Sequence, residues 1–175
     1  MLDLRVTENV RPHMQYCLLK LTSDEQLPDM LPGQFVEVRV DHSASTFLRR
    51  PISINFVDWE KNELWLLIQL VGDGTRQLAE SSVGDLINVV LPLGNGFTLP
   101  AEEIPSKRLL LVGGGVGTAP MLYLGACLKA KGYEPIFLSS WVHVQQEICN
   151  SCLISNGSVR FMRLQKMALT ARRVM

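Results

Sequence analysis

The first hundred residues alternate between short apolar runs and turn-forming residues. Runs of strand length cover 14–22, 35–40, 63–70 and 85–91, and the second of them reads Phe-Val-Glu-Val-Arg-Val. Segments rich in Gly, Pro, Asp and Asn separate these runs, at 32–33, 58–62, 72–74, 84–85 and 92–96. Because no long helical pattern intervenes, this half of the chain is predicted to form a small antiparallel barrel.

The pattern changes after Pro105. A four-residue apolar run at 109–112 is predicted to be a buried strand, and a glycine loop follows it at 113–117. The next elements are a helix over 119–131, with Leu122, Leu124 and Leu128 facing inward, and a second strand over 134–138. Strand, glycine loop, helix and strand in this order predict the first βαβ unit of a nucleotide-binding sheet.

Composition excludes several classes of protein. The chain carries 17 basic and 17 acidic residues, which disfavours a binder of nucleic-acid phosphates, and it is 47% hydrophobic, which favours a buried core. The longest uncharged run, 109–128, contains glycines and a proline and therefore does not resemble a membrane span. The amino terminus alternates without an apolar signal core, and the few cysteines fit a reducing compartment, so we expect a cytoplasmic protein.

The first motif joins two anion-binding devices. Arg49-Arg50-Pro51-Ile52-Ser53 lies on a predicted strand, and Gly72-Asp73-Gly74-Thr75 opens a predicted short helix over 76–81. An arginine offers a fork of donors to phosphate oxygens, and a helix start offers backbone N–H groups to the same anion. The pair indicates a dinucleotide pyrophosphate, while a solvated arginine beside an ordinary helix cap is the alternative.

The second motif is the glycine loop 113–120. It lacks side chains, so a dinucleotide could approach the backbone, although tight packing alone would also favour glycine. Other candidates are weaker: His13, His42 and His143 are isolated, and Cys149 and Cys152 form half a metal site without a second pair. We therefore predict neither a metal ligand nor a catalytic acid or base.

Together the motifs resemble the ferredoxin-reductase-like flavoproteins, in which an FAD-binding barrel precedes a pyridine-nucleotide domain. The form Arg50-Pro51-Ile52-Ser53 is typical of one branch, the electron-transfer subunit of NAD-dependent dihydroorotate dehydrogenase. Further matches to that branch are Leu67-Ile68-Gln69, Gly74-Thr75, residues 92–97 and residues 113–120. The resemblance covers 2–138.

The resemblance implies a six-stranded antiparallel Greek-key FAD-binding barrel over 1–100 and an incomplete parallel α/β nucleotide-binding domain over 106–138. It places Arg50 at the FAD pyrophosphate, and Ile52 and Ser53 at the isoalloxazine ring. Contacts to the rest of FAD are implied for Pro51, for the backbone of Leu67, Ile68 and Gln69, and for Gly74 and Thr75 at the phosphates. NADH would be held by Gly113, Gly114, Gly115, Gly117 and Thr118.

The function implied is electron transfer. The chain would pass electrons between NAD(H) and a catalytic dihydroorotate dehydrogenase subunit through FAD, in pyrimidine biosynthesis and within a heterotetramer. Family members also carry a [2Fe–2S] cluster on a Cys-x4-Cys-x2-Cys…Cys pattern, which this sequence lacks. The alternatives are a stand-alone NAD(P)H-dependent flavin or hydrogenase-linked reductase and a truncated, non-catalytic FAD-binding remnant.

The tail, 139–175, differs from the rest of the chain. It holds five basic residues against Glu147 alone, and all nine prolines lie at or before Pro135. When the permitted codons of residues 140–144 and 163–175 are read in a frame shifted by one base, they can encode two residue strings. Both strings resemble segments of the family's sequences, and they occur in the same order as in the family. We therefore expect a frame slip near 138–140 followed by termination, which makes the tail aberrant and poorly structured. A genuine lineage-specific tail is the alternative.

Overall fold

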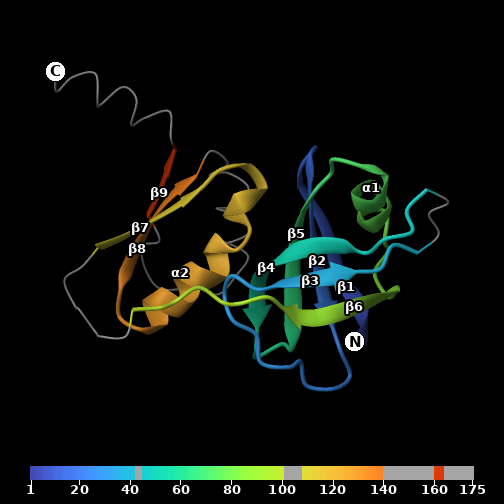
Figure 1. The fold of residues 1–175 in the computed structure, drawn as a ribbon, viewed down its shortest axis with the longest axis horizontal. Helices are drawn as coiled ribbons and strands as arrows, with labels where there is room; N and C mark the ends of the chain where they lie inside the picture. Colours follow the sequence, from blue (N-terminus) through green and yellow to red (C-terminus); the bar gives the residue numbers. More distant parts are fainter. Residues whose placement is uncertain (42–44, 101–107, 140–159, 164–175) are drawn as a thin grey trace. The chain divides into compact units, whose positions relative to one another are not determined.

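A computed structural model of the chain describes residues 1–41, 45–100, 108–139 and 160–163 (Figure 1). The chain divides into two units, Met1–Phe97 and Thr98–Met175. Each unit has its own sheet: the sheet of the first unit is antiparallel and that of the second is parallel.

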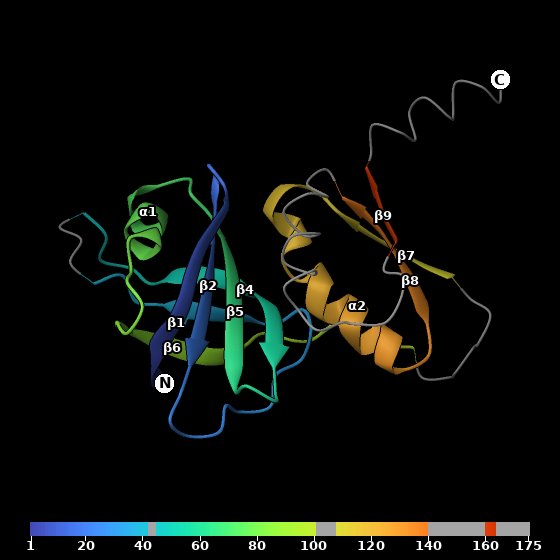
Figure 2. The same cartoon turned by 180° about the vertical axis from the view of Figure 1, so that it is seen from behind.

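The first unit is a closed antiparallel barrel of six strands with one short helix. Its elements are β1 (Leu2–His13), β2 (Tyr16–Thr22), β3 (Phe35–Val38), β4 (Arg50–Asp58), β5 (Glu63–Gln69), α1 (Asp73–Ala79) and β6 (Leu86–Leu93). The strand order is β1-β2-β5-β4-β3-β6, and Figure 2 shows β1, β2, β5 and β4 side by side. Strands β3, β4 and β5 follow one another as a meander while β6 returns beside β3, which is a Greek key. The predicted barrel is confirmed.

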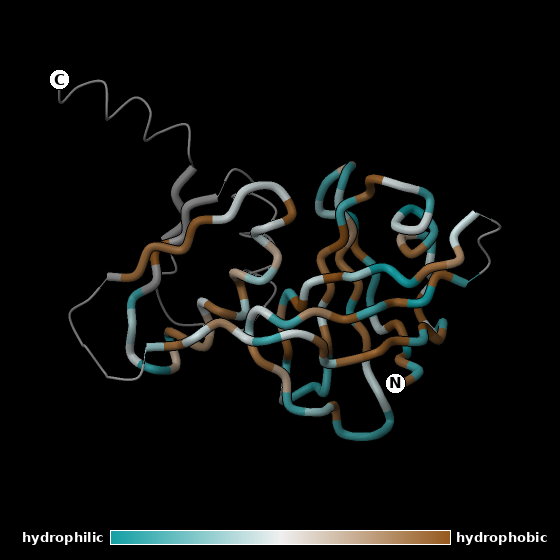
Figure 3. The backbone as a smooth tube through the Cα atoms, viewed as in Figure 1, coloured by the Kyte–Doolittle hydropathy of each residue, from teal (hydrophilic) through white to brown (hydrophobic). Residues whose placement is uncertain are grey.

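Hydrophobic residues are concentrated on the strands of the barrel and hydrophilic residues on the connections between them (Figure 3). Strand β5 is buried on both faces from Leu64 to Ile68. Its Trp65 is fully buried, with the Lys20 ammonium 4.1 Å from its ring centroid, a cation–π contact across the strand pair β2–β5. Trp59, by contrast, is 41% exposed in the turn after β4.

Helix α1 begins earlier than the sequence predicted. We expected a helix over 76–81, whereas it spans Asp73–Ala79. The Thr75 hydroxyl accepts the N–H groups of Val71 and Gly72, at 3.1 Å each, and donates to the Gly72 carbonyl at 3.0 Å. The Thr75 side chain therefore caps the start of α1, and Asp73, Gly74 and Thr75 of the motif form its first turn.

The second unit is a parallel three-stranded sheet with one helix. Its elements are β7 (Arg108–Gly113), the 3-10 turn η1 (Gly115–Thr118), α2 (Met121–Ala130), β8 (Glu134–Ser139) and β9 (Arg160–Arg163), in the sheet order β7-β8-β9. Leu122, Leu124 and Leu128 of α2 are buried as predicted. Neither described helix has the length and apolar character needed to cross a membrane.

The predicted burial of β7 is wrong for one of its faces. Leu109 and Leu111 pack against the cluster of Leu124 and Leu128, but Leu110 and Val112 are 55% and 57% exposed. Successive strand residues point to opposite faces, and in the described part of the chain a helix packs on only one of them.

Strand β9 lies within the segment predicted to be poorly structured, and it pairs in parallel with β8. The rest of that segment, 140–159 and 164–175, lies outside the described residues. The predicted frame slip and segment boundaries therefore stay predictions.

Candidate functional site

A pocket of about 420 Å³ lies between the start of β4 and the start of α1. Its lining residues come from three chain segments: Ser45, Thr46, Arg50, Pro51, Ile52, Val71, Gly72, Asp73, Gly74 and Thr75. Five of the predicted flavin residues are among them, namely Arg50, Pro51, Ile52, Gly74 and Thr75. The fold thus brings together the two anion-binding devices that are separated in the sequence.

Gly74 packs tightly where α1 meets the arginine. A Cβ atom at this position would lie 3.0 Å from Thr46 Cγ2 and 3.2 Å from Arg50 Cδ, closer than most real Cβ contacts. A side chain here would displace Arg50 or fill the pocket beside it. The Thr75 hydroxyl is engaged in the helix cap, so the backbone N–H groups of this first turn are what α1 can offer an anion.

The two adjacent arginines have separate surroundings. Arg49 donates to the Glu37 carbonyl at 3.3 Å, to the Asn88 carbonyl at 3.0 Å and to the Asn88 side chain, so it ties β3 to β6. Arg50 lines the pocket, and its Nε donates to the carbonyl of Arg49 at 3.0 Å. Arg49 therefore supports the barrel, whereas Arg50 is placed to meet a ligand.

The other predicted flavin residues lie on β4 and β5 and do not line this pocket. Ser53 is half-buried on β4 and pairs with Phe35 of β3. Leu67 and Ile68 are 1% and 0% exposed, backbone included, so their predicted backbone contacts with FAD stay a prediction. Gln69 ends β5, two residues before the pocket residue Val71.

Sequence reasoning missed part of the lining. Ser45 and Thr46 lie in a loop without periodicity or motif, and no signal in the sequence pointed to them. Asp73 was quoted within the glycine motif but given no role. Its carboxylate accepts from Ser45 Oγ at 3.3 Å and lies 3.5 Å from Arg76 Nη1, so the acid is partly neutralised at the pocket rim.

The glycine loop of the second unit divides into two groups. Gly113 is explained by packing, because a Cβ there would lie 2.9 Å from Thr118 Cα, and Gly115 by its φ of +55°. Gly114 and Gly117 have open space around the missing Cβ and no positive φ. Tight packing within the described residues therefore does not explain them, and ligand approach remains a sufficient reason. The buried Thr118 hydroxyl donates to the Gly115 carbonyl at 2.9 Å.

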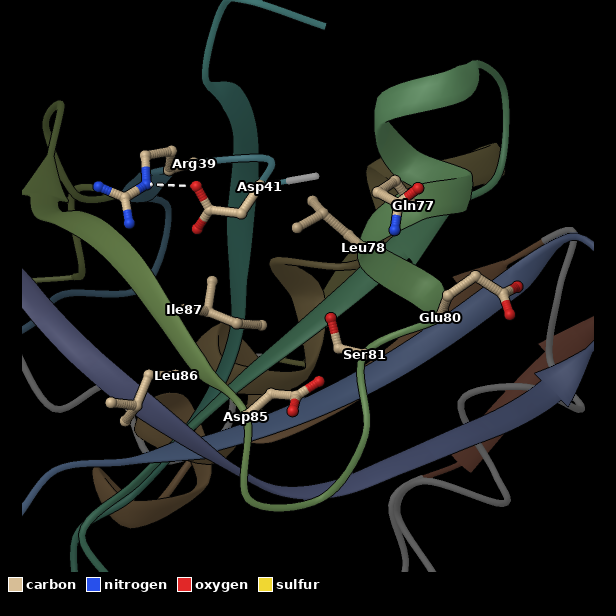
Figure 4. Close-up of a pocket in the computed structure, with 9 residues that line it drawn as sticks. All are labelled: Arg39, Asp41, Gln77, Leu78, Glu80, Ser81, Asp85, Leu86 and Ile87. Atoms are coloured by element: carbon tan, nitrogen blue, oxygen red, sulfur yellow. Dashed lines mark ion pairs between the residues drawn. The ribbon is translucent and has the colours of Figure 1, made fainter. Parts of the chain in front are cut away.

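A second pocket in the barrel unit, of about 260 Å³, contains none of the predicted site residues. It is lined by Arg39, Asp41, Gln77, Leu78, Glu80, Ser81, Asp85, Leu86 and Ile87 (Figure 4). Its carboxylates have partners. Asp41 Oδ1 lies 2.8 Å from Arg39 Nε, and Glu80 Oε1 lies 2.8 Å from Arg11 Nη2. The Asp85 carboxylate accepts the backbone N–H of Ser82 at 2.8 Å.

No three His, Cys, Asp or Glu side chains are grouped to hold a metal ion in the described residues. His42, His143, Cys149 and Cys152 lie outside those residues. Of the other cysteines, Cys17 is buried in the barrel and Cys127 lies on α2. Burial raises the pKa of both thiols, to about 11 for Cys17.

Relatives of known name resemble this chain. It is 46% identical to the electron transfer subunit of dihydroorotate dehydrogenase B (NAD(+)) from Bacillus mycoides over 108 residues, which are 61% of this chain and 41% of the relative. The subunit of the same name from Lysinibacillus sphaericus is 43% identical over 112 residues, 64% of this chain and 43% of the relative. The chain thus matches about two fifths of its relatives' length. No protein-family model matches it.

Solved structures of reductases share the fold. An NADH-dependent reduced ferredoxin-NADP oxidoreductase has a TM-score of 0.67 and 26% identity, over 79% of this chain and 48% of that one. Phthalate dioxygenase reductase, described as a modular structure for electron transfer from pyridine nucleotides to [2Fe-2S], has a TM-score of 0.64 and 25% identity, over 79% and 43%. These findings confirm the predicted resemblance to the dihydroorotate dehydrogenase electron transfer subunits and the ferredoxin-reductase-like fold. The named relatives of this chain are subunits of an oxidoreductase.

Proposed function

We propose that this chain is an FAD-binding electron-transfer component that passes electrons between NAD(H) and a catalytic dihydroorotate dehydrogenase subunit. The observation that carries the proposal is the pocket in which Arg50 meets the first turn of α1. A guanidinium and free helix-start amides are the donors that a diphosphate requires. The names of the relatives support electron transfer as the role.

The pocket residues fit FAD. Arg50, Gly74 and Thr75 would hold the diphosphate, Ile52 and Ser53 would face the isoalloxazine ring, and Pro51 would contact another part of FAD. When bound, FAD supplies the ability to accept two electrons from NADH and release them singly. The protein binds and orients the cofactor, and the predicted site needs no acid or base from the chain.

For NADH, the proposed contact is the loop from Gly113 to Thr118, in which Gly114 and Gly117 leave the backbone open. The proposed segments remain 1–100 for flavin, 106–138 for NADH and 139–175 as an out-of-frame tail. Resequencing the DNA from the codon of Gly132 onward tests the last of these. An extra or missing base near Leu138 would make the tail a sequencing artefact, an unchanged sequence with the family's frame continuing downstream would indicate a natural slip, and an unchanged sequence without that frame would refute the slip.

The chain's own cysteines do not fit a [2Fe–2S] cluster. Cys17 has no exposed surface within the barrel, and the spacing of the four cysteines lacks the cluster pattern. No cluster step is therefore assigned to these residues. The catalytic subunit and the heterotetramer are proposed as partner and assembly on the names of the relatives.

Flavin titration tests the proposal. We expect the purified chain to bind FAD with quenching of flavin fluorescence, and we expect its absorbance to bleach when NADH is added without oxygen. Bleaching that reverses on adding the catalytic subunit with orotate supports the subunit role, whereas turnover with free flavin alone supports the stand-alone reductase. Binding without bleaching identifies an FAD-binding remnant. Failure to bind FAD at all refutes the site.

A further inference from the structure

Helix α1 has one end at the diphosphate pocket and the other end held by strand β1. The Asn9 Nδ2 group donates to the Ala79 carbonyl at 3.0 Å and to the Ser81 carbonyl at 2.6 Å. Arg11 Nη2 also donates to the Ala79 carbonyl at 3.0 Å and pairs with the Glu80 carboxylate at 2.8 Å. Two side chains of β1 therefore bind the last carbonyl of α1, that of Ala79, and Asn9 also binds the Ser81 carbonyl just beyond the helix. Figure 4 shows Glu80 and Ser81 at this end of the helix.

These contacts complete the helix end. The carbonyls of Gln77 and Leu78 already accept from Glu80 and Ser81 N–H groups, at 3.1 and 3.3 Å. The final carbonyls of a helix have no partner within it, and Asn9 and Arg11 provide those partners here. A helix of seven residues is also too short to be stable by itself in water. Its direction therefore depends on such anchors and on the burial of Leu78.

The Asn9 amide has only one orientation that satisfies its neighbours. Carbonyl oxygens can only accept, so the amide nitrogen must face Ala79 and Ser81, and Oδ1 must face the other way. There it accepts from the Cys17 thiol at 3.0 Å. The Cys17 side chain is fully buried, and burial raises its pKa to about 11, so the thiol remains a donor at neutral pH.

We propose that Asn9 and Arg11 are positioning residues that fix the direction of α1 and thereby set the affinity of the pocket for the diphosphate of FAD. The helix is about 10 Å long, so a tilt permitted at Ala79 moves the amides of Gly74 and Thr75 away from a bound phosphate. The inference rests on the proposed FAD site and adds residues that do not line it. Riboflavin, which has the ring system without the phosphates, does not use α1.

The test compares FAD with riboflavin in three variants of the full chain. Asn9→Ala removes the two hydrogen bonds that Asn9 donates, to the Ala79 and Ser81 carbonyls, and Arg11→Met removes the guanidinium but keeps an apolar stem. Each should raise the Kd for FAD about tenfold and leave the Kd for riboflavin within about twofold. Arg5→Met is the matched control, because Arg5 is a half-exposed arginine of the same strand that lies 3.9 Å from Asp24 instead. It should change neither affinity.

The outcomes separate the inference from the proposed function. The inference is overturned if Asn9→Ala and Arg11→Met lose FAD and riboflavin affinity equally, because that indicates general damage to the fold. It is also overturned if both variants bind FAD as tightly as the wild type. If the wild-type chain binds no FAD, the proposed function fails and the affinity claim fails with it. Hydrogen exchange of the flavin-free chain then still tests the anchoring. The amides of α1 should exchange faster in Arg11→Met than in Arg5→Met, and equal rates refute it.

Discussion

The adjacent residues Arg49 and Arg50 allow a sharp test of the flavin site. Substitution of Arg50 should weaken FAD binding, whereas substitution of Arg49 should lower folding stability. Arg50→Gln removes the positive charge from the pocket and keeps a side chain of similar shape. A hydrogen bond between charged groups contributes about 1.5–3 kcal/mol, and this rim is open to solvent, so we take about 2 kcal/mol. At about 1.4 kcal/mol per factor of ten, the Kd for FAD should rise about thirtyfold.

Arg49→Met is the partner variant. It leaves the Glu37 and Asn88 carbonyls and the Asn88 side chain without their guanidinium donor, a loss of about 2–3 kcal/mol of folding stability. For a unit of this size the midpoint of thermal unfolding should fall by on the order of 10 °C. The Kd for FAD should change little at temperatures where the variant is folded.

Fluorescence titration with FAD and thermal unfolding monitored by circular dichroism measure the two effects. Added salt should weaken FAD binding by the wild-type chain more than by Arg50→Gln, since salt screens the interaction of exposed charges. The reasoning is refuted if Arg50→Gln binds FAD as the wild type does, or if Arg49→Met loses as much FAD affinity as Arg50→Gln.

Three further predictions follow from the same structure. Gly74→Ala should weaken FAD binding about tenfold without lowering the midpoint of thermal unfolding, because alanine favours the helix while its Cβ crowds the pocket; isothermal titration with unchanged affinity contradicts this. Gly114→Ala and Gly117→Ala should abolish NADH-dependent bleaching and leave stability unchanged, whereas Gly113→Ala should destabilise the unit; NADH kinetics and urea unfolding check both. Cys17 should contribute a fall of about 2 kcal/mol in the free energy of unfolding between pH 9 and 11, because its raised pKa stabilises the fold only while the thiol is protonated. Urea unfolding at both pH values should show a smaller fall for Cys17→Ala than for the wild type, and an equal fall contradicts this.

The barrel and its pocket were largely predictable because their signals are local. Turn residues between short apolar runs mark the strands, and the motifs at Arg50 and Gly74 mark both walls of the pocket. Strand alternation then separates the roles of Arg49 and Arg50 once the structure shows what each one contacts.

What the sequence could not show depends on distant contacts. The start of α1 is set by a hydroxyl that bonds backward to Gly72, which composition does not reveal. The exposed face of β7 depends on which elements cover it and not on its own apolar residues. Asn9 and its acceptor Ala79 are 70 positions apart, so no periodicity links them.

Closure of the barrel has a consequence for modularity. Each of its six strands has a hydrogen-bonded neighbour on both sides, with β6 joining β1 to β3, so the first unit presents no open sheet edge. Its backbone pairing is complete before Thr98. Residues after Phe97 can therefore be exchanged or shortened without removing a strand pairing from the first unit. The barrel can be joined to a different second domain with all of its strand pairs intact.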